Sequence, residues 1–525
     1  MNWAELIVLI FYFVAMLAIG VVFFLRSKSR SDKDYFLGGK SMGPWVTAMS
    51  AQASDMSAWL LMGLPGSILA FGLGKAWIGI GLAIGTALNW ILMAKRLRRF
   101  SEAADDAITV PQYLSNRFKT KSRALQISCA VVFLVCFTVY VASAFVAGTG
   151  VFTSLFPQMD EWLAMIIFAF ILIVYTFLGG YKAVCWTDFV QGLLMLVAVL
   201  AVPIVIAITK DLDFSVLDKI VEVKNEAGDV TGTFPFVKNL FKSDWRDIAS
   251  GLAWGLGYFG MPHILVRFMA IKKASMVKKS ATVAIVWVVL ALVAVIFIAL
   301  FGRILIGEEL ITSDKQSMVF IDLARDVFGS IPVIGSVIVG FLLSAIIAAS
   351  MSTADSQLLV ASSSFTSDIY KPVIRKNASE KETLWVGRIV VLVIAVVAFL
   401  LAFYVITFTK EGDTNPIMAL VECAWAGFGS AFGSVMILSV FWRRFTYRGA
   451  LAGVIAGALT DIIWVILFSG VANLFDPIIT QLGIYELIPG FIVSMAAAII
   501  VTLIDKAPSK EITDIYDAAT APEKE

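Results

Sequence analysis

Charged residues and metal-binding side chains are scarce in this chain of 525 residues. Charged residues make up 15% of it, there is one histidine, and the four cysteines form no CxxC pair. The sequence therefore gives no sign of a transition-metal site. It also lacks the clustered nucleophile and base that an enzyme needs, so neither an enzyme nor a cofactor is expected. The net charge is only +2 and the basic residues are spread over many short segments, so no nucleic-acid partner is expected.

Long apolar runs dominate the sequence, with 59% hydrophobic residues and a mean hydropathy of +0.88. A bilayer core about 30 Å thick needs roughly 20 apolar residues per helix, and lipid leaves no partner for an unpaired backbone group. We therefore expect an all-α, multi-pass protein with the lipid bilayer as its surroundings and about 13 transmembrane helices. The first run, from Trp3 to Leu25, lacks a small-residue cleavage site after it and is interpreted as a retained span. The expected spans lie near residues 3–25, 44–72, 76–94, 126–156, 162–180, 187–209, 247–267, 281–302, 332–357, 385–407, 416–441, 449–469 and 486–504.

Lysine and arginine predict the orientation, because short cytoplasmic loops are enriched in them. Basic residues crowd the segment after the first expected span and the segment between Lys95 and Arg123. Both segments are expected inside, which places the N-terminus outside and the C-terminus inside a cytoplasmic (inner) membrane. The polar tail after Asp505 is expected to be disordered.

Two of the expected spans contain breaks, and they lie five spans apart. Span two has a run of small and polar residues from Ala48 to Trp59, and span seven has four glycines and a proline between Gly251 and Pro262. Broken spans at matching places in two halves indicate an inverted repeat with a binding site near the membrane midplane. The glycines of span seven have a second interpretation, which is close helix packing without any break.

The expected organisation is a peripheral span and loop at 1–41, a first repeat at 42–209, an extracytoplasmic loop at 210–246, a second repeat at 247–442, peripheral spans at 443–505 and a cytoplasmic tail at 506–525.

Asp55 lies in the break of span two, where an ionised carboxylate is costly unless it meets a cation or a wet cavity. Unwinding would free backbone carbonyls near Ala53 and Met56 for such a cation. Span nine offers hydroxyls at Ser352 and Thr353, and these oxygens suit a hard cation such as sodium. Two alternatives stay open at this point. The carboxylate could be held by hydrogen bonds for packing, and the hydroxyls could bond back to carbonyls of their own helix.

Aromatic residues accompany the breaks. Trp254, Tyr258 and Pro262 recur at four-residue spacing and so share one face of span seven, while Trp59 and Tyr140 could complete the walls of an apolar pocket. A packing stripe or an interfacial aromatic belt is the alternative. The lone histidine, His263, is interpreted as a packed side chain, Asp188 as a residue that favours a helix start at the inner edge, and Asp355, Glu422 and Asp461 receive no role.

Six stretches of the sequence resemble the sodium:solute symporter family, and within it the bacterial sodium/proline branch. They are Tyr35 to Lys40 (YFLGGK), Ser54 to Gly66 (SDMSAWLLMGLPG), Gly179 to Gln191 (GGYKAVCWTDFVQ), Trp254 to His263 (WGLGYFGMPH), Met351 to Thr353 (MST) and Ala424 to Gly429 (AWAGFG). The chain departs from the relatives at Lys40, where they have Arg, at Met261, where they have Gln, and at the three unassigned acids.

The resemblance implies a five-plus-five inverted-repeat core that imports L-proline with sodium ion by alternating access. A symporter for another small solute, such as another amino acid, pantothenate or a sugar, is the alternative, and a channel is a more distant one. The implied sodium-binding residues are Ala53, Asp55, Met56, Ala349, Ser352 and Thr353. The implied substrate-binding residues are Ser57, Trp59, Gly63, Tyr140, Trp254, Tyr258 and Pro262. Lys40 and Asp188 are further functional candidates.

Overall fold

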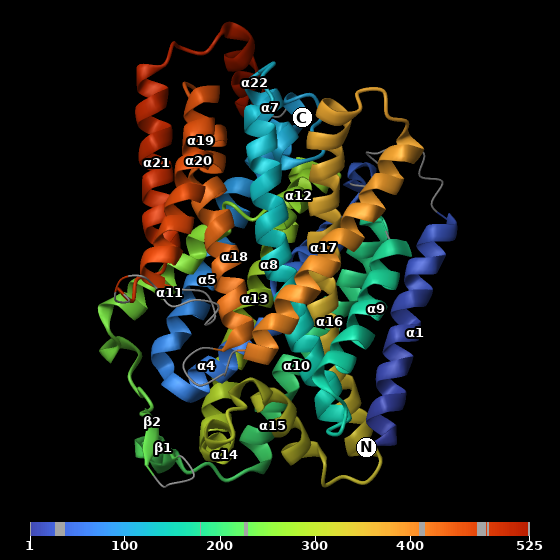
Figure 1. The fold of residues 1–525 in the computed structure, drawn as a ribbon, viewed down its shortest axis with the longest axis vertical. Coiled ribbons are helices and arrows are strands. Elements are labelled where there is room, and N and C mark those ends of the chain that lie inside the picture. The colour runs from blue at the N-terminus through green and yellow to red at the C-terminus, as the bar shows by residue number, and fades with distance from the viewer. Residues whose placement is uncertain are drawn as a thin grey trace.

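The computed structural model describes residues 2–26, 37–178, 180–224, 229–408, 415–469, 479 and 482–522, and nearly all of its regular structure is helical (Figure 1). The helices of the first part are α1 (Trp3–Arg26), α3 (Pro44–Asp55), α4 (Gly63–Phe71), α5 (Ala76–Leu88), α6 (Lys95–Ala103), α7 (Val110–Arg117), α8 (Ala124–Leu155), α9 (Glu161–Leu178) and α10 (Tyr181–Thr209). Those of the second part are α11 (Trp245–Gly257), α12 (Pro262–Ala270), α13 (Val277–Leu305), α14 (Gly307–Thr312), α15 (Val319–Phe328), α16 (Ile334–Ser364), α17 (Glu380–Phe408), α18 (Pro416–Phe428), α19 (Ser434–Phe441), α20 (Tyr447–Trp464), α21 (Leu487–Ile504) and α22 (Lys510–Thr520).

Two ends of the helical bundle can be told apart in Figure 1. One end carries the start of α1, the helices α14 and α15, and an antiparallel hairpin of β1 (Val221–Lys224) and β2 (Val230–Phe234), and we call it the hairpin end. The other carries α7 and α22, and we call it the tail end. The hairpin lies in the expected loop 210–246, where no strand was predicted.

Ten helical segments of the described residues are long and apolar enough to cross a membrane. They coincide with ten of the expected spans. The remaining three correspond to the two broken spans, each made of two short helices, and to α9, whose apolar part is slightly shorter. The multi-pass α-helical class is thus confirmed, and the number 13 stays a prediction.

Both predicted breaks are present. In span two, α3 ends at Asp55, a 3₁₀ turn covers Ala58–Leu60, and α4 begins at Gly63. In span seven, α11 ends at Gly257 and α12 begins at Pro262. Each broken pair is followed by a comparable set of long helices, which is the order expected of a five-plus-five repeat. The core forms where α3 packs against α10, α13 and α16.

The glycines of α11 serve close packing in addition to the break. A Cβ on Gly85 of α5 would lie 2.4 Å from the Cα of Gly255, and a Cβ on Gly81 would lie 2.2 Å from the carbonyl oxygen of Gly251. The packing interpretation is therefore correct for Gly251 and Gly255. The break itself begins only after these two residues.

The prediction of a disordered tail is wrong for residues Lys510–Thr520, which form α22. Ile515 and Ala519 are buried, and Arg443 donates two hydrogen bonds to Asp517 at 2.8 and 2.7 Å. These hydrogen bonds hold the pKa of the Asp517 carboxyl below its usual range. The prediction failed because it used the low mean hydropathy of the tail, whereas the tail forms an amphipathic helix that packs on the tail end of the bundle.

Candidate functional site

The break of span two forms because the backbone leaves helical geometry at Met56, whose φ and ψ are −85° and 75°. Ser57 is extended, and its Oγ accepts a hydrogen bond from the amide of Trp59 at 3.4 Å, which starts the next turn. A helix end leaves carbonyl groups without intrahelical partners. The break therefore presents carbonyl oxygens inside the bundle, away from lipid.

Hydroxyl groups of α16 meet the last turn of α3. Ser352 Oγ lies 2.7 Å from the carbonyl oxygen of Ala53 and 3.3 Å from that of Ala349, and Thr353 Oγ1 lies 3.5 Å from the Ala53 oxygen. The hydroxyls thus face α3. The alternative, a hydrogen bond to a carbonyl of their own helix, explains the contact of Ser352 with Ala349 but not the contacts with Ala53. Four of the six predicted sodium-binding residues meet here, and Met56 lies at the break three residues beyond Ala53.

The Asp55 side chain points to the break of span seven. Its Oδ2 accepts a hydrogen bond from the Tyr258 hydroxyl at 2.6 Å, and Oδ1 has no hydrogen-bond partner among the described residues. Its backbone carbonyl lies 3.3 Å from Trp59 Nε1 and 3.4 Å from the Tyr140 hydroxyl. Asp55 therefore joins the two breaks. The alternative that its carboxylate is held by hydrogen bonds for packing accounts for Oδ2 but not for the buried Oδ1.

The aromatic residues predicted for the substrate surround this contact. Trp59, Tyr140, Trp254 and Tyr258 are all at most 1% exposed. Trp59, Tyr140 and Tyr258 contact Asp55 directly, while Trp254 lies one turn before Tyr258 on α11. These side chains lie inside the bundle, so an interfacial belt is excluded for them.

Three smaller predicted residues shape the same region. Ser57 caps the turn before Trp59, Pro262 occupies the first turn of α12, and Gly63 begins α4. A Cβ on Gly63 would lie 2.9 Å from the side chain of Met418 on α18, so a larger residue would require that side chain to move. The position is therefore constrained by packing.

Trp425 of α18 was missed in the sequence analysis. Its Nε1 donates to the carbonyl oxygen of Trp254 at 2.8 Å, and its ring lies 5.0 Å from that of Tyr258 in an edge contact. A Cβ on Gly257 would lie 2.0 Å from Trp425 Nε1. Trp425 thus holds the end of α11 in place, and Gly257 is required for that approach.

Asp188 does not begin a helix, which corrects the sequence interpretation. The helix α10 begins at Tyr181, two turns earlier, and Asp188 is fully buried. Its Oδ2 forms an ion pair with Arg267 of α12 at 3.0 Å. Arg267 was missed, although an arginine inside a span is costly enough to signal a partner.

The remaining candidates make other contacts. Lys40 forms an ion pair with Asp106 at the tail end. His263 packs its ring against those of Phe137 and Tyr140, as expected of a packed histidine. Asp355 Oδ1 accepts a hydrogen bond from Ser356 at 3.3 Å. Among the acids without a role, Glu422 belongs to α18 and Asp461 Oδ1 accepts a hydrogen bond from Ser430 at 3.4 Å.

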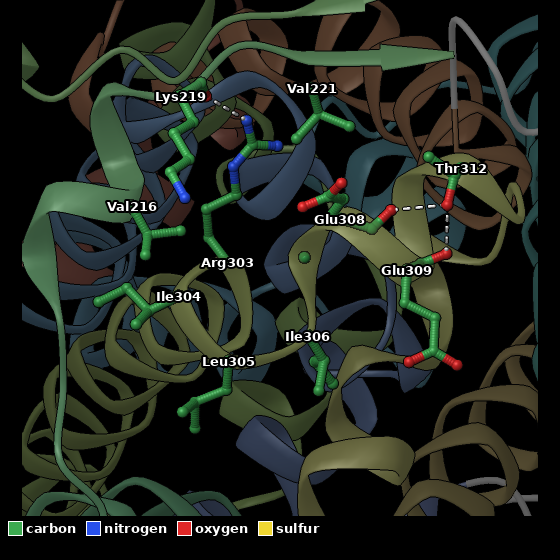
Figure 2. A pocket seen from close by; sticks show the side chains of 11 residues that line it. Val216, Lys219, Val221, Arg303, Ile304, Leu305, Ile306, Glu308, Glu309 and Thr312 are labelled. Carbon is green, nitrogen blue, oxygen red and sulfur yellow. Dashed lines mark hydrogen bonds between the residues drawn. The ribbon is translucent and has the colours of Figure 1, made fainter. Parts of the chain in front are cut away.

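A cavity of about 480 Å³ lies at the hairpin end, apart from the two breaks (Figure 2). It is bounded by the end of α13, by α14 and by the segment before β1. The charged side chains Lys219, Arg303, Glu308 and Glu309 line it together with aliphatic ones. None of the predicted site residues lines it.

Two facing breaks in repeated helices, with buried oxygens and aromatic rings between them, define a secondary transporter of the inverted-repeat type. The model of the sodium:solute symporter family matches residues 35–457, and the chain belongs to that family.

Named relatives are similar over almost their whole length. The chain is 42% identical to the high-affinity proline transporter PutP of Bacillus subtilis over 96% of this chain and 98% of the relative. It is 41% identical to the sodium/proline symporter of Escherichia coli, over 97% and 95%.

Among solved structures, a Na⁺-coupled sialic acid symporter in a substrate-bound outward-open state matches with a TM-score of 0.72 and 18% identity, over 97% of this chain and 99% of that one. MhsT in complex with L-phenylalanine matches with a TM-score of 0.53 and 15% identity, over 87% and 97%. These two likenesses show the fold, and the family expectation is confirmed.

Proposed function

We propose that this protein imports L-proline together with sodium ion across the bacterial cytoplasmic membrane. The observation that carries the proposal is the meeting of the Ser352 and Thr353 hydroxyls with the Ala53 carbonyl at the break of span two. Such hydroxyl and carbonyl oxygens are the ligands that a hard cation prefers. The names of relatives that are 41–42% identical supply the substrate. No enzymatic step and no cofactor besides the coupling ion belong to this function.

Sodium is proposed to bind between α3 and α16. The carbonyl oxygens of Ala53, Met56 and Ala349 and the hydroxyls of Ser352 and Thr353 would hold it. Asp55 is one residue before Met56 and supplies negative charge next to this oxygen set. Its hydrogen bond from Tyr258 connects the ion to the second break.

Proline is proposed to bind between the two breaks. Trp59, Tyr140, Trp254 and Tyr258 offer apolar faces to the ring of the substrate, and Ser57, Gly63 and Pro262 shape the adjoining turns. The amide groups of Gly63 and His263, in the first turns of α4 and α12, lie at the two breaks, where they favour the substrate carboxylate. The substrate thus contacts residues that are held by Asp55, next to the proposed sodium site. The affinity for proline should therefore depend on bound sodium.

We propose that the tail end is cytoplasmic, because the basic segment between Lys95 and Arg123, which contains α7, belongs to it (Figure 1). The N-terminus then lies outside. Under about 100 mV, inside negative, and a tenfold sodium gradient, one sodium ion supplies about 2.3 plus 1.4 kcal/mol. This free energy sustains roughly a few hundredfold accumulation of proline at a one-to-one ratio.

Counterflow in proteoliposomes tests this function. Purified protein should exchange external labelled proline for internal proline when sodium is present and lose the exchange when choline replaces sodium. An excess of unlabelled proline should suppress the signal, whereas pantothenate or a sugar should not. Exchange that ignores sodium, or that pantothenate suppresses and proline does not, would contradict the assignment.

Tyr258→Phe tests the connection between the breaks. The variant keeps the ring but loses the 2.6 Å hydrogen bond to Asp55, which is worth about 1.5–3 kcal/mol when one partner is charged. We expect the sodium concentration for half-maximal uptake to rise about tenfold or more. The matched control is Tyr447→Phe, which removes an exposed hydrogen bond to Ser122 and should leave sodium dependence unchanged.

Lys40 and Met42 form a latch at the tail end. Lys40 pairs with Asp106 after α6, and the carbonyl oxygen of Met42 accepts a hydrogen bond from the amide of Lys272 at 3.0 Å. The latch joins the segment before α3 to the segments that follow α6 and α12, and we propose that it opens before the substrate leaves toward the cytoplasm.

Lys40→Gln should therefore favour the inward-open state. We expect uptake to fall about threefold to tenfold, with faster reaction of cysteines introduced at the tail end with a thiol reagent, since the variant loses the ion pair of the buried Lys40 side chain with Asp106. Lys40→Arg keeps the pair and should retain uptake. The exchanged pair Lys40→Asp with Asp106→Lys should restore part of it, and no restoration would count against the latch.

A further inference from the structure

Arg267 sits in a shell of oxygen atoms beside the two breaks. Its Nε lies 2.9 Å from Ser50 Oγ, and its Nη1 lies 2.5 Å from the carbonyl oxygen of His263. Its Nη2 lies 2.5, 3.0 and 2.6 Å from Ser54 Oγ, Asp188 Oδ2 and Ser356 Oγ. We call these five oxygens the arginine cage. Arg267 is only 1% exposed, so the cage is closed to solvent.

The arginine cage has the composition of a sodium site. It contains three hydroxyls, one carbonyl and one carboxylate, which are hard ligands that suit a hard cation. The guanidinium group carries the charge of such a cation and cannot lose it, because its pKa in proteins lies too high for deprotonation. The cage is thus filled by a cation that is part of the chain.

The cage adjoins the proposed sodium site on the same two helices. Ser54 follows Ala53 on α3, and Ser356 lies one turn after Ser352 on α16. Two mobile cations and a guanidinium in so small a region would repel one another in a medium of low dielectric constant. Without the guanidinium, in contrast, Asp188 would be a buried charge lacking its partner, which is strongly destabilising.

We propose that Arg267 is a tethered cation that fills a second sodium cage and thereby restricts coupling to one sodium ion per substrate. Removal of the guanidinium lets a second sodium ion bind between Asp188 and the hydroxyls of Ser50, Ser54 and Ser356. Asp355, next to Ser356, places a further carboxyl group beside the emptied cage. The inference rests on the proposed function and deepens it, because it assigns the number of coupling ions to a residue.

Equilibrium binding of labelled proline to purified protein in lipid nanodiscs tests this, with sodium titrated against choline. The dependence on sodium should have a Hill coefficient near one for the unchanged protein and near two for Arg267→Gln. Arg267→Lys keeps a tethered cation and should stay near one. The double variant Arg267→Gln with Asp188→Asn removes the carboxylate that attracts the second ion and should return to one.

Arg303→Gln is the matched control. Arg303 is also buried in a span, but the hydrogen bonds of its guanidinium to described residues go to backbone carbonyls, those of Leu69, Lys219 and Phe234. Its replacement removes a buried cation without emptying a cage that holds a carboxylate, so the Hill coefficient should stay near one.

All variants are purified in high sodium, because an ion that binds only the folded state stabilises it by mass action. Arg267→Met serves as a second variant if Arg267→Gln does not assemble. A Hill coefficient that stays near one in a folded variant, a folded variant that no longer binds proline, or failure of both variants to assemble in high sodium would each overturn the proposal. If the unchanged protein binds proline without regard to sodium, the proposed function itself is wrong.

Discussion

Asp55→Asn is expected to raise the sodium concentration for half-maximal proline uptake about 100-fold, with the protein still inserted in the membrane. The carboxylate lies next to the carbonyls of the break, and one of its oxygens has no hydrogen-bond partner among the described residues. The amide keeps the size and the hydrogen bond from Tyr258 but removes the negative charge. Uptake into membrane vesicles at a series of sodium concentrations measures the effect.

Asp517→Asn is the matched control for this prediction. Asp517 is an exposed carboxylate of the tail end that bonds to Arg443, far from both breaks. Its replacement should leave the sodium dependence unchanged. If Asp55→Asn behaves like Asp517→Asn, then Asp55 has no part in the ion site.

Replacing both hydroxyls of the proposed sodium site should have the largest effect of all. Ser352→Ala with Thr353→Ala removes two oxygen ligands and leaves the Ala53 carbonyl without its partners at 2.7 and 3.5 Å. At about 1.5–3 kcal/mol for each contact to a charged group, sodium affinity should fall about 100-fold to 10,000-fold. Sodium-dependent binding of labelled proline should then vanish at any practical sodium concentration.

Ser344→Ala on the same helix separates this effect from a loss of packing. Its hydroxyl donates a hydrogen bond to the carbonyl oxygen of Gly340, in the same helix, at 2.8 Å. Sodium-dependent binding should be retained in this variant. Equal losses in both variants would show that α16 hydroxyls serve helix stability and that the ion binds elsewhere.

The breaks could be predicted because their signals are local. Small, polar and helix-breaking residues interrupt an apolar run only where the backbone is buried in protein, so the ends of α3 and α11 lie where the sequence suggests. The same local signal could not separate the two uses of glycine. Gly255 packs against α5, whereas Gly257 makes room for Trp425, and only the arrangement of the helices distinguishes them.

Contacts between residues that are distant in the sequence could not be predicted from the sequence alone. Asp188 was interpreted from its position near the start of an apolar run, but its partner Arg267 lies 79 positions away. Trp425 was noted only as part of a matching stretch, because its contacts to Trp254 and Tyr258 require α18 to lie beside α11.

The helix in the tail could not be predicted from composition either. Its polar character suggested disorder, yet Ile515 and Ala519 are spaced to cover one face of α22. The helix becomes stable when that face packs on the bundle, so tertiary packing, and not composition, decided its structure.

Simultaneous uptake of labelled sodium and labelled proline into proteoliposomes tests the central claim most directly. Coupling of binding is reciprocal, so proline must raise the affinity for sodium by the same factor by which sodium raises the affinity for proline. The two solutes should therefore enter together. With one sodium site occupied and the second filled by Arg267, equal moles of the two labels should enter above the background of empty liposomes. Proline entry that continues in choline, or sodium entry that does not respond to proline, would contradict sodium-coupled proline transport by this protein.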